Sequence, residues 1–307
     1  MTVNREGDGT PTDPKEQFLI GLDYYTGTFV RQSFEEAFRW FSIAAEQDDP
    51  NALCLLGKMY MYGQGVGQSY PLALGYLERA SEMDVPQAKY ELGLMYQAGM
   101  GADPCPEKTA SLWSSAADEG YTTAQLGMAY LCETGTGVPR SNRKAFEWSL
   151  LAARQGLSAA QTKVGISYEE GVGTDRSYPD AERWLRTAAE NGDPRALFEL
   201  GWMRYFGLGC KESQTEAKRL IDKALDRGVY DILNREAMTS NPYSQLRLGW
   251  LYDMGWGVKQ SCFRALAWYS GARFMGLKGA ERFIDSICVR MEAESKADNG
   301  RETSSII

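Results

Sequence analysis

The chain has 307 residues, of which 43% are hydrophobic, so it can bury a substantial core and is unlike a disordered sequence. Its net charge is −8, and the absence of a basic cluster disfavours nucleic-acid binding. Histidine is absent and the six cysteines include no Cys-x-x-Cys pair, so the sequence indicates neither a metal site nor histidine-based catalysis.

The sequence offers no segment for membrane insertion or export. No apolar run reaches the about 18 residues that a membrane-spanning helix needs. Residues 1–13 are polar and lack the apolar stretch of a signal peptide. We therefore expect a cytoplasmic protein, with residues 1–14 as a disordered N-terminal arm.

Gly-x-Gly turns recur along the sequence at intervals of 36 residues. Complete turns occur at Gly63/Gly65, Gly99/Gly101, Gly135/Gly137, Gly171/Gly173 and Gly207/Gly209. An incomplete copy, Gly27 with Phe29, precedes them, and Gly255/Gly257 follows after a longer step of 48 residues. Such a fixed period is the signature of a repeat protein.

A small anchor residue precedes each turn by six positions. The anchors are Gly21, Gly57, Gly93, Ala129, Gly165, Gly201 and Gly249. Three residues after the anchor, five copies have tyrosine, and Cys132 and Arg204 are the exceptions. The segment that ends at each turn is predicted to be a first helix, here called helix A.

A second helix, helix B, is predicted after each turn. Ala145, Trp148 and Ala152 in one copy illustrate apolar spacings of three, four and seven residues, which place side chains on one face of an α-helix. Helices of about 12 residues are not stable alone. Stacking of seven pairs over residues 15–291 predicts a single all-α superhelix, or solenoid.

The repeat resembles the Sel-one-like repeat family, a relative of the tetratricopeptide repeats. The family pattern A-x-x-x-L-G-x-x-Y-x-x-G-x-G-V is met nearly in full by residues 52–66 and 160–172, and the helix B pattern by 144–156 and 181–192. The resemblance implies a right-handed α-superhelix that acts as an adaptor or scaffold for other proteins. Bacterial members include immunity proteins against toxins.

Two segments depart from the repeat. About 12 extra residues lie near 229–243, where we expect a loop or added turn. Such an insertion either borders a binding face or is neutral, and the sequence does not decide between these alternatives. A capping helix is expected at about 278–291, followed by a disordered tail over 292–307.

A partner-binding surface is expected on helix A, which lines the concave face of related superhelices. Positions three residues before the anchor and one and five residues after it point away from the buried face of the helix. Exposed aromatic side chains there would form a groove for a partner peptide or helix. The candidate residues are Tyr62, Tyr130, Trp202, Phe206, Trp250, Met254 and Trp256. Alternatively, curvature of the superhelix buries these residues against neighbouring helices.

The sequence favours a non-catalytic protein-interaction module, an adaptor or scaffold. An immunity or inhibitor protein that neutralises one toxin or enzyme is the alternative within the binding class. Catalysis is not expected, because the acidic residues follow no shared spacing that would pair two of them. End-to-end self-assembly is disfavoured by the polar termini. No cofactor, metal or small-molecule substrate is expected.

Overall fold

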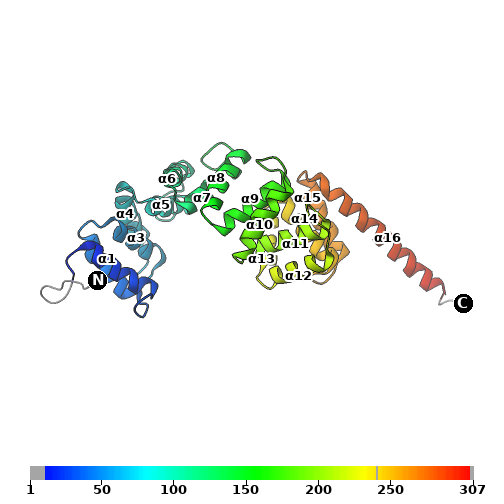
Figure 1. Cartoon of the computed structure of the whole chain (residues 1–307), viewed down its shortest axis with the longest axis horizontal. Coiled ribbons are helices and arrows are strands. Elements are labelled where there is room, and N and C mark those ends of the chain that lie inside the picture. The colour runs from blue at the N-terminus through cyan, green and yellow to red at the C-terminus, as the bar shows by residue number, and fades with distance from the viewer. Residues whose placement is uncertain (1–10, 240, 305–307) are drawn as a thin grey trace. The chain divides into compact units, whose positions relative to one another are not determined.

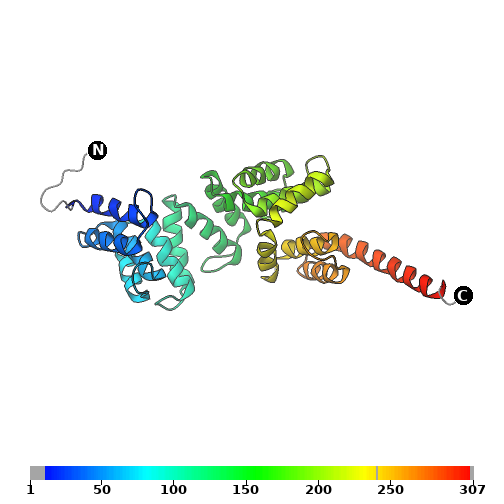
Figure 2. The ribbon, with the colours of Figure 1, turned by 90° about the horizontal axis from the view of Figure 1, so that it is seen from below.

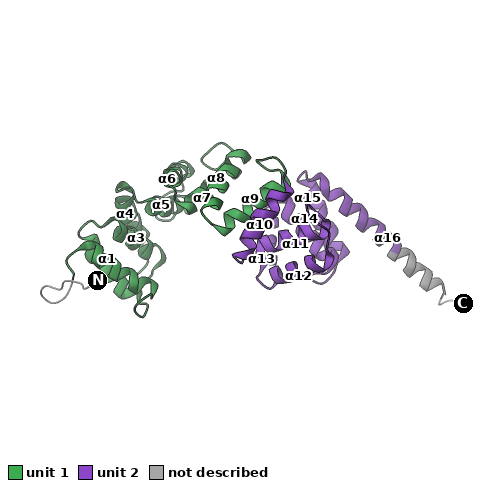
Figure 3. Ribbon diagram, in the orientation of Figure 1, with its two compact units in different colours: residues 1–176 green, residues 177–307 purple. Residues whose placement is uncertain are grey.

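The structure, a computed structural model, describes residues 11–239 and 241–304, with side chains described as far as residue 293. All regular structure in these ranges is helical, which confirms the all-α prediction (Figure 1). By compactness the chain divides into two units, residues 1–176 and 177–307 (Figure 3). The boundary lies in the turn between the two helices of the fifth repeat, so the expected single solenoid over 15–291 stays a prediction.

The first unit contains nine helices among its described residues. They are α1 (Pro14–Thr26), α2 (Phe34–Ala45), α3 (Pro50–Tyr62), α4 (Tyr70–Glu82), α5 (Pro86–Ala98), α6 (Pro106–Asp118), α7 (Thr122–Thr134), α8 (Asn142–Arg154) and α9 (Ser158–Glu170). The odd-numbered helices here are helices A, and the even-numbered ones are helices B.

The second unit continues the pattern with one added helix. Its helices are α10 (Tyr178–Glu190), α11 (Pro194–Phe206), α12 (Gln214–Leu225), α13 (Val229–Met238), α14 (Pro242–Met254), α15 (Cys262–Phe274), the 3-10 helix η1 (Lys278–Ala280) and α16 (Glu281–Ser304). Helices α11 and α14 are helices A, and α10, α12 and α15 are helices B.

The first glycine of each turn ends helix A. Gly63, for example, has φ 68°, in the left-handed region, and its N–H bonds to the Met59 carbonyl. Helix B then begins at a serine in six of the seven repeats. The Ser141 side chain accepts the N–H of Lys144 at 3.3 Å, as expected of an N-cap residue.

The residue three positions after the anchor ties the two helices of a repeat together. We call it the bridge residue: Tyr24, Tyr60, Tyr96, Cys132, Tyr168, Arg204 or Tyr252. In six of the seven repeats, Tyr168 being the exception, its backbone carbonyl accepts the N–H of the helix B N-cap, as in Ser69 to Tyr60 at 3.0 Å and Ser213 to Arg204 at 2.9 Å. Because only the backbone takes part, the bond survives when the tyrosine is replaced.

The second glycine of the turn is required by the preceding repeat. A Cβ at Gly65 would overlap with the backbone of Phe34, and a Cβ at Gly137 with the carbonyl of Pro106. Phe34 and Pro106 are the first residues of α2 and α6, the helices B of the preceding repeats. In the first repeat this position is Phe29, which is 83% exposed, so no described helix approaches it.

Buried glutamines add a further connection between repeats. The side chain of Gln125 donates to the Ala117 carbonyl at 3.2 Å, and Gln161 donates to that of Ala153 at 3.3 Å. Each bond joins a helix A to a carbonyl in the last turn of the preceding helix B, which also accepts the backbone N–H of the following glycine, Gly120 or Gly156. The repeat pattern did not predict this role.

The insertion near 229–243 contains the packed helix α13 and is therefore more than a loop. Val229, Leu233 and Ala237 on α13 are almost fully buried in the core of the second unit. Gln245 on α14 donates to the Ala237 carbonyl at 3.1 Å, the bond that other repeats make to a preceding helix B. The added helix thus takes the place of a helix B beside the seventh repeat.

The C-terminal helix is longer than expected. Helix α16 follows η1 at Glu281, within the predicted capping segment 278–291, but its backbone stays helical to Ser304 (Figure 2). Residues 292–297 include glutamate, alanine and lysine, which favour a helix even where the sequence is polar. Residues 305–307 of the expected tail and 1–10 of the expected arm lie outside the described residues.

Alanine at Gly137 tests the second-glycine contact. We expect Gly137→Ala to lower the free energy of unfolding by about 2–3 kcal/mol, because φ is 69° and the added Cβ meets the Pro106 carbonyl. The control is Gly75→Ala within α4, where a Cβ meets nothing within 4 Å; it should stabilise by about 0.5–1 kcal/mol. Urea unfolding measures both, and an unaffected Gly137→Ala variant would contradict the contact.

Candidate protein-binding surface

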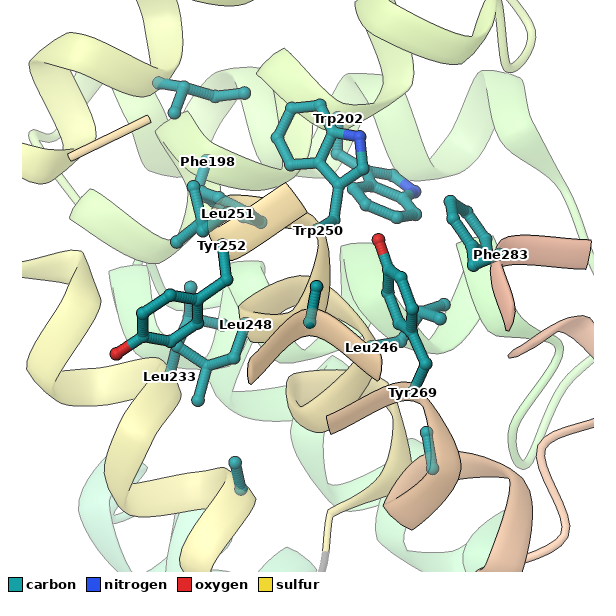
Figure 4. Packing of buried hydrophobic residues seen from close by; sticks show 14 of the residues in the cluster. Phe198, Trp202, Leu233, Leu246, Leu248, Trp250, Leu251, Tyr252, Tyr269 and Phe283 are labelled. Atoms are coloured by element: carbon teal, nitrogen blue, oxygen red, sulfur yellow. The ribbon is translucent and has the colours of Figure 1, made fainter. Parts of the chain in front are cut away.

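Trp202 and Trp250 lie in the core of the second unit. They are only 3% and 2% exposed, and their rings meet edge to face at 5.3 Å (Figure 4). The expectation that they line an open groove is therefore wrong, and burial against neighbouring helices is the outcome.

The chain's own C-terminal helix covers this aromatic surface. Phe283 on α16 lies 6.1 Å from the Trp202 ring and 5.8 Å from the Phe206 ring, and Ile287 is fully buried. Arg290 on α16 forms an ion pair with Asp253 on α14. The face that was expected to receive a partner helix is thus occupied by a helix of the same chain.

A buried ion network packs against Trp202. Glu199, with no exposed surface, pairs with Arg195 at 3.0 Å and with Arg247 at 3.1 Å. The Arg247 guanidinium lies 4.2 Å from the centre of the Trp202 ring, within range of a cation–π interaction. Removing one partner of such a buried group leaves an uncompensated charge, so the network constrains this region of the core.

The other three C-terminal candidates are half-buried. Phe206, Met254 and Trp256 all pack against the core cluster that contains Trp250. The Trp256 ring lies 5.0 Å from that of Trp250, and the Tyr205 hydroxyl lies 3.6 Å from the Met254 sulfur. The structure therefore brings these residues together, as the sequence predicted, but as a packed cluster.

The two N-terminal candidates are exposed. Tyr62 on α3 is 53% exposed, and Tyr130 on α7 is 50% exposed. Tyr62 stands beside an ion pair between Lys58 on α3 and Glu91 on α5, whose charged atoms are 3.0 Å apart. Because Glu91 is buried, this pair joins two consecutive repeats beneath the exposed tyrosine.

Four tyrosines surround this ion pair. We call the group the tyrosine face: Tyr25, Lys58, Tyr62, Tyr90, Glu91 and Tyr121. Its members come from α1, α3, α5 and the N-cap of α7. Tyr130 is exposed on α7 and is not among the residues tied to the ion pair.

The surroundings hold the tyrosine face in place. The Tyr90 ring stacks on Trp113 at 5.3 Å and lies 5.6 Å from Tyr121. The Tyr25 hydroxyl donates to Gln64 at 2.9 Å. A surface that is ordered before binding loses less side-chain entropy when a partner arrives.

Electrostatics at the tyrosine face follow from burial and from Glu91. Burial, followed by the nearby carboxylate, raises the pKa of Tyr90 to about 12 and also raises the pKa of Tyr62. Burial acts to lower the pKa of Lys58, but Glu91 outweighs it, so the Lys58 pKa is raised. The face therefore presents neutral phenols and a paired charge at neutral pH.

Of this group, only Tyr62 was among the residues predicted to bind a partner. Lys58 and Tyr90 occupy positions one after and three before their anchors, which the helical wheel also points away from the buried face. Glu91 carried no such signal, because its importance comes from the charge on the next helix.

Three features of the described residues bear on metal binding, thiol chemistry and membrane insertion. They contain no group of three histidine, cysteine, aspartate or glutamate side chains placed to hold a metal ion. All six cysteines are unpaired, and burial raises the pKa of Cys54 to about 12, which keeps that thiol protonated. No helix in the described part of the chain is long and apolar enough to cross a membrane.

Substitution of Trp202 distinguishes a core residue from a surface residue. Trp202→Ala should destabilise by about 3–5 kcal/mol, as expected for a large buried aromatic side chain. The matched control is Tyr62→Ala, which should change stability by less than about 0.5 kcal/mol. Thermal melting reports both, and an unchanged melting curve for Trp202→Ala would show that the ring is not in the core.

Alkaline titration tests the environment of the buried tyrosines. The pKa values of Tyr90 and Tyr230 are raised to about 12, by burial and then by Glu91 and Tyr252 respectively. Their stabilisation is complete below the ordinary pKa of about 10 and is lost as the pH rises through the folded value. Stability should therefore fall between about pH 10 and pH 12.

Absorbance at 295 nm counts the late-ionising phenols in this titration. Tyr90→Phe and Tyr230→Phe should each remove one late-ionising tyrosine from the curve of the folded chain. An identical late phase in both variants would contradict the burial of these two phenols.

Comparison with known proteins shows the family to which the chain belongs. The sequence model of the Sel1 repeat matches residues 17–49, 50–85, 86–121, 122–157, 158–193, 194–229 and 242–272. No curated protein matches the chain.

Solved structures agree with this match. The protective antigen c5321 of uropathogenic Escherichia coli, described as displaying an SLR fold, is 29% identical, with a TM-score of 0.64 over 89% of this chain and 56% of that one. The chain thus spans only about half of that relative. A Sel1 repeat protein from Oxalobacter formigenes is also 29% identical, with a TM-score of 0.67 over 72% of this chain and 91% of that one.

A more distant likeness is the immunity protein Pa5087 from Pseudomonas aeruginosa, with 21% identity and a TM-score of 0.44 over 71% of this chain and 83% of that one. This likeness is too remote to bear on function. The seven matched segments cover most of the chain, and proteins with this repeat generally mediate protein–protein interactions. The chain belongs to the Sel1 repeat family of α-helical solenoid proteins.

Proposed function

We propose that this chain is a non-catalytic interaction module that binds a peptide or helix of another protein on the tyrosine face. The observation that carries the proposal is Tyr62, which stays 53% exposed beside an ion pair that joins two repeats through the buried Glu91. Tyrosine is favoured at binding hot spots because its rigid ring offers both apolar area and a polar hydroxyl.

The second unit supports the choice of this face. Its corresponding helix A positions, which include Trp202 and Trp250, are already filled by α16 and by each other. A partner would therefore find open aromatic surface on the first unit, at Tyr62 and at Tyr130. The role is that of an adaptor or scaffold, in a reducing cytoplasm compatible with unpaired cysteines.

Partner capture tests this proposal. The full chain serves as bait in lysate from its native source, beside a Tyr62→Ala variant. We expect the variant to lose the partner, with retention falling at least about tenfold, because the Tyr62 ring contributes contact area. The control is Phe263→Ala on α15, which removes an aromatic side chain that is 77% exposed elsewhere on the chain.

The pattern of capture also separates the candidate roles. Several partners in modest amounts would indicate a scaffold, whereas one partner in equal amount would indicate an inhibitor or immunity protein. Retention of every partner by Tyr62→Ala, or equal loss by Phe263→Ala, would contradict binding at the tyrosine face.

A further inference from the structure

Bridge side chains fill the space between successive helices B. The Tyr60 ring lies 5.5 Å from Phe38 on α2 and 5.6 Å from Tyr76 on α4. The Tyr252 hydroxyl lies 2.8 Å from that of Tyr230 on α13, while Arg264 on α15 lies 5.4 Å from its ring. In both units, therefore, this tyrosine is held between the helix before its own repeat and the helix B that follows it.

Both repeats that lack the tyrosine have a cavity beside the bridge residue. A cavity of about 460 Å³ adjoins Cys132, among residues of α6, α7 and α8. A larger cavity of about 670 Å³ adjoins Arg204, among residues of α10, α11 and α12. The larger volume lies within the range of about 300–1,000 Å³ typical of ligand pockets.

Arg204 replaces ring packing by ion pairing. Its guanidinium lies 2.8 Å from Glu182 on α10 and 3.5 Å from Glu216 on α12. The repeat keeps its backbone connection, because the Arg204 carbonyl still accepts the N–H of Ser213. The substitution thus leaves the hairpin intact, and Arg204 takes the place of the bridge ring while also lining the cavity.

The Arg204 cavity combines an apolar floor with a cationic rim. Leu197, Leu200 and Leu220 contribute apolar surface. Four cationic side chains line the cavity against two carboxylates, although the whole chain has a net charge of −8. The cations are Arg186, Arg204, Lys223 and Arg227, and the carboxylates are Glu190 and Glu216.

Two of these cations remain available to a ligand. Lys223 is exposed and has no ion-pair partner among the described residues. Arg227 is also exposed, and it donates to the Gly192 carbonyl at 2.8 Å, so its charge is not neutralised by that bond. Arg186 and Arg204, by contrast, share Glu182.

We propose that the Arg204 cavity binds an aromatic side chain of a partner protein flanked by acidic residues. The ring enters the cavity beside Arg204, which Leu197, Leu200 and Leu220 also line. The flanking carboxylates meet Lys223 and Arg227 at the rim. This site uses other helices than the tyrosine face, so it stands or falls independently of the function proposed above.

Refilling the cavity tests the proposal without deleting a core side chain. The probe is a fluorescein-labelled peptide Glu-Glu-Tyr-Glu-Glu, followed by fluorescence anisotropy with the full chain. Arg204→Tyr restores the residue typical of the repeat and should weaken binding at least about tenfold. Cys132→Tyr fills the other cavity and should leave affinity within about twofold.

Charge reversal at Lys223 provides a second test, which does not change the packing of side chains inside the cavity. Lys223→Glu changes an exposed side chain and should lower the affinity for the peptide at least about tenfold. The remaining affinity should depend less on salt concentration. Circular dichroism confirms that each variant is folded.

Four results would overturn the proposal. They are no saturable binding by the native chain, equal binding by Lys223→Glu, equal binding of the peptide Glu-Glu-Ala-Glu-Glu, and binding of free 4-hydroxyphenylacetate as tight as that of the peptide. The third would mean that charge alone attracts the probe. The last would assign the cavity to a small aromatic acid instead of a protein segment.

Discussion

Close approach of consecutive repeats is the constraint on which the structure depends. Each pair of helices is too short to be stable alone, so it must bury its apolar face against a neighbour. Gly65 and Gly137 make this possible, because any larger side chain would overlap with the start of the preceding helix B. Gln125 adds a side-chain hydrogen bond from α7 to the Ala117 carbonyl in the last turn of α6. Phe29 stands where no described helix comes close, which explains why the first repeat does without the second glycine.

The same constraint separates positions that hold the fold from positions that can bind. A bridge residue serves the fold through its carbonyl, which leaves its side chain free to vary, as it does at Arg204. Helix A positions that face away from the repeat junction are open in the first unit, where Tyr62 is exposed. In the second unit Phe283 covers the equivalent surface, so an aromatic-rich sequence there produces core. Aromatic content alone therefore does not identify a binding face. Whether such a face is open depends on which other segments of the chain pack against it.

The 36-residue period was enough to predict the helix pairs and their turns. Glycines at positive φ mark the turns, and N-cap residues such as Ser141 occur where a helix begins, so both features are visible in the local sequence. The burial of Trp202 was not predictable from a helical wheel, which gives a direction but not the segment, about 80 residues later, that packs there. Helix α13 was missed because the insertion has no counterpart in the repeat. Glu91 escaped notice because its role depends on Lys58 in the neighbouring repeat. Local structure could thus be predicted from the sequence, whereas contacts between distant segments could not.

Hydroxyl-radical footprinting of the full native chain would test most directly which aromatic face is open. Modification rates, each divided by the rate of the same residue in the urea-unfolded chain, report the exposure of individual side chains. We expect rapid modification of Tyr62 and Tyr130 and strong protection of Trp202, Trp250 and Phe283. Rapid modification of the two tryptophans, or protection of both tyrosines, would contradict the assignment of the open surface to the first unit.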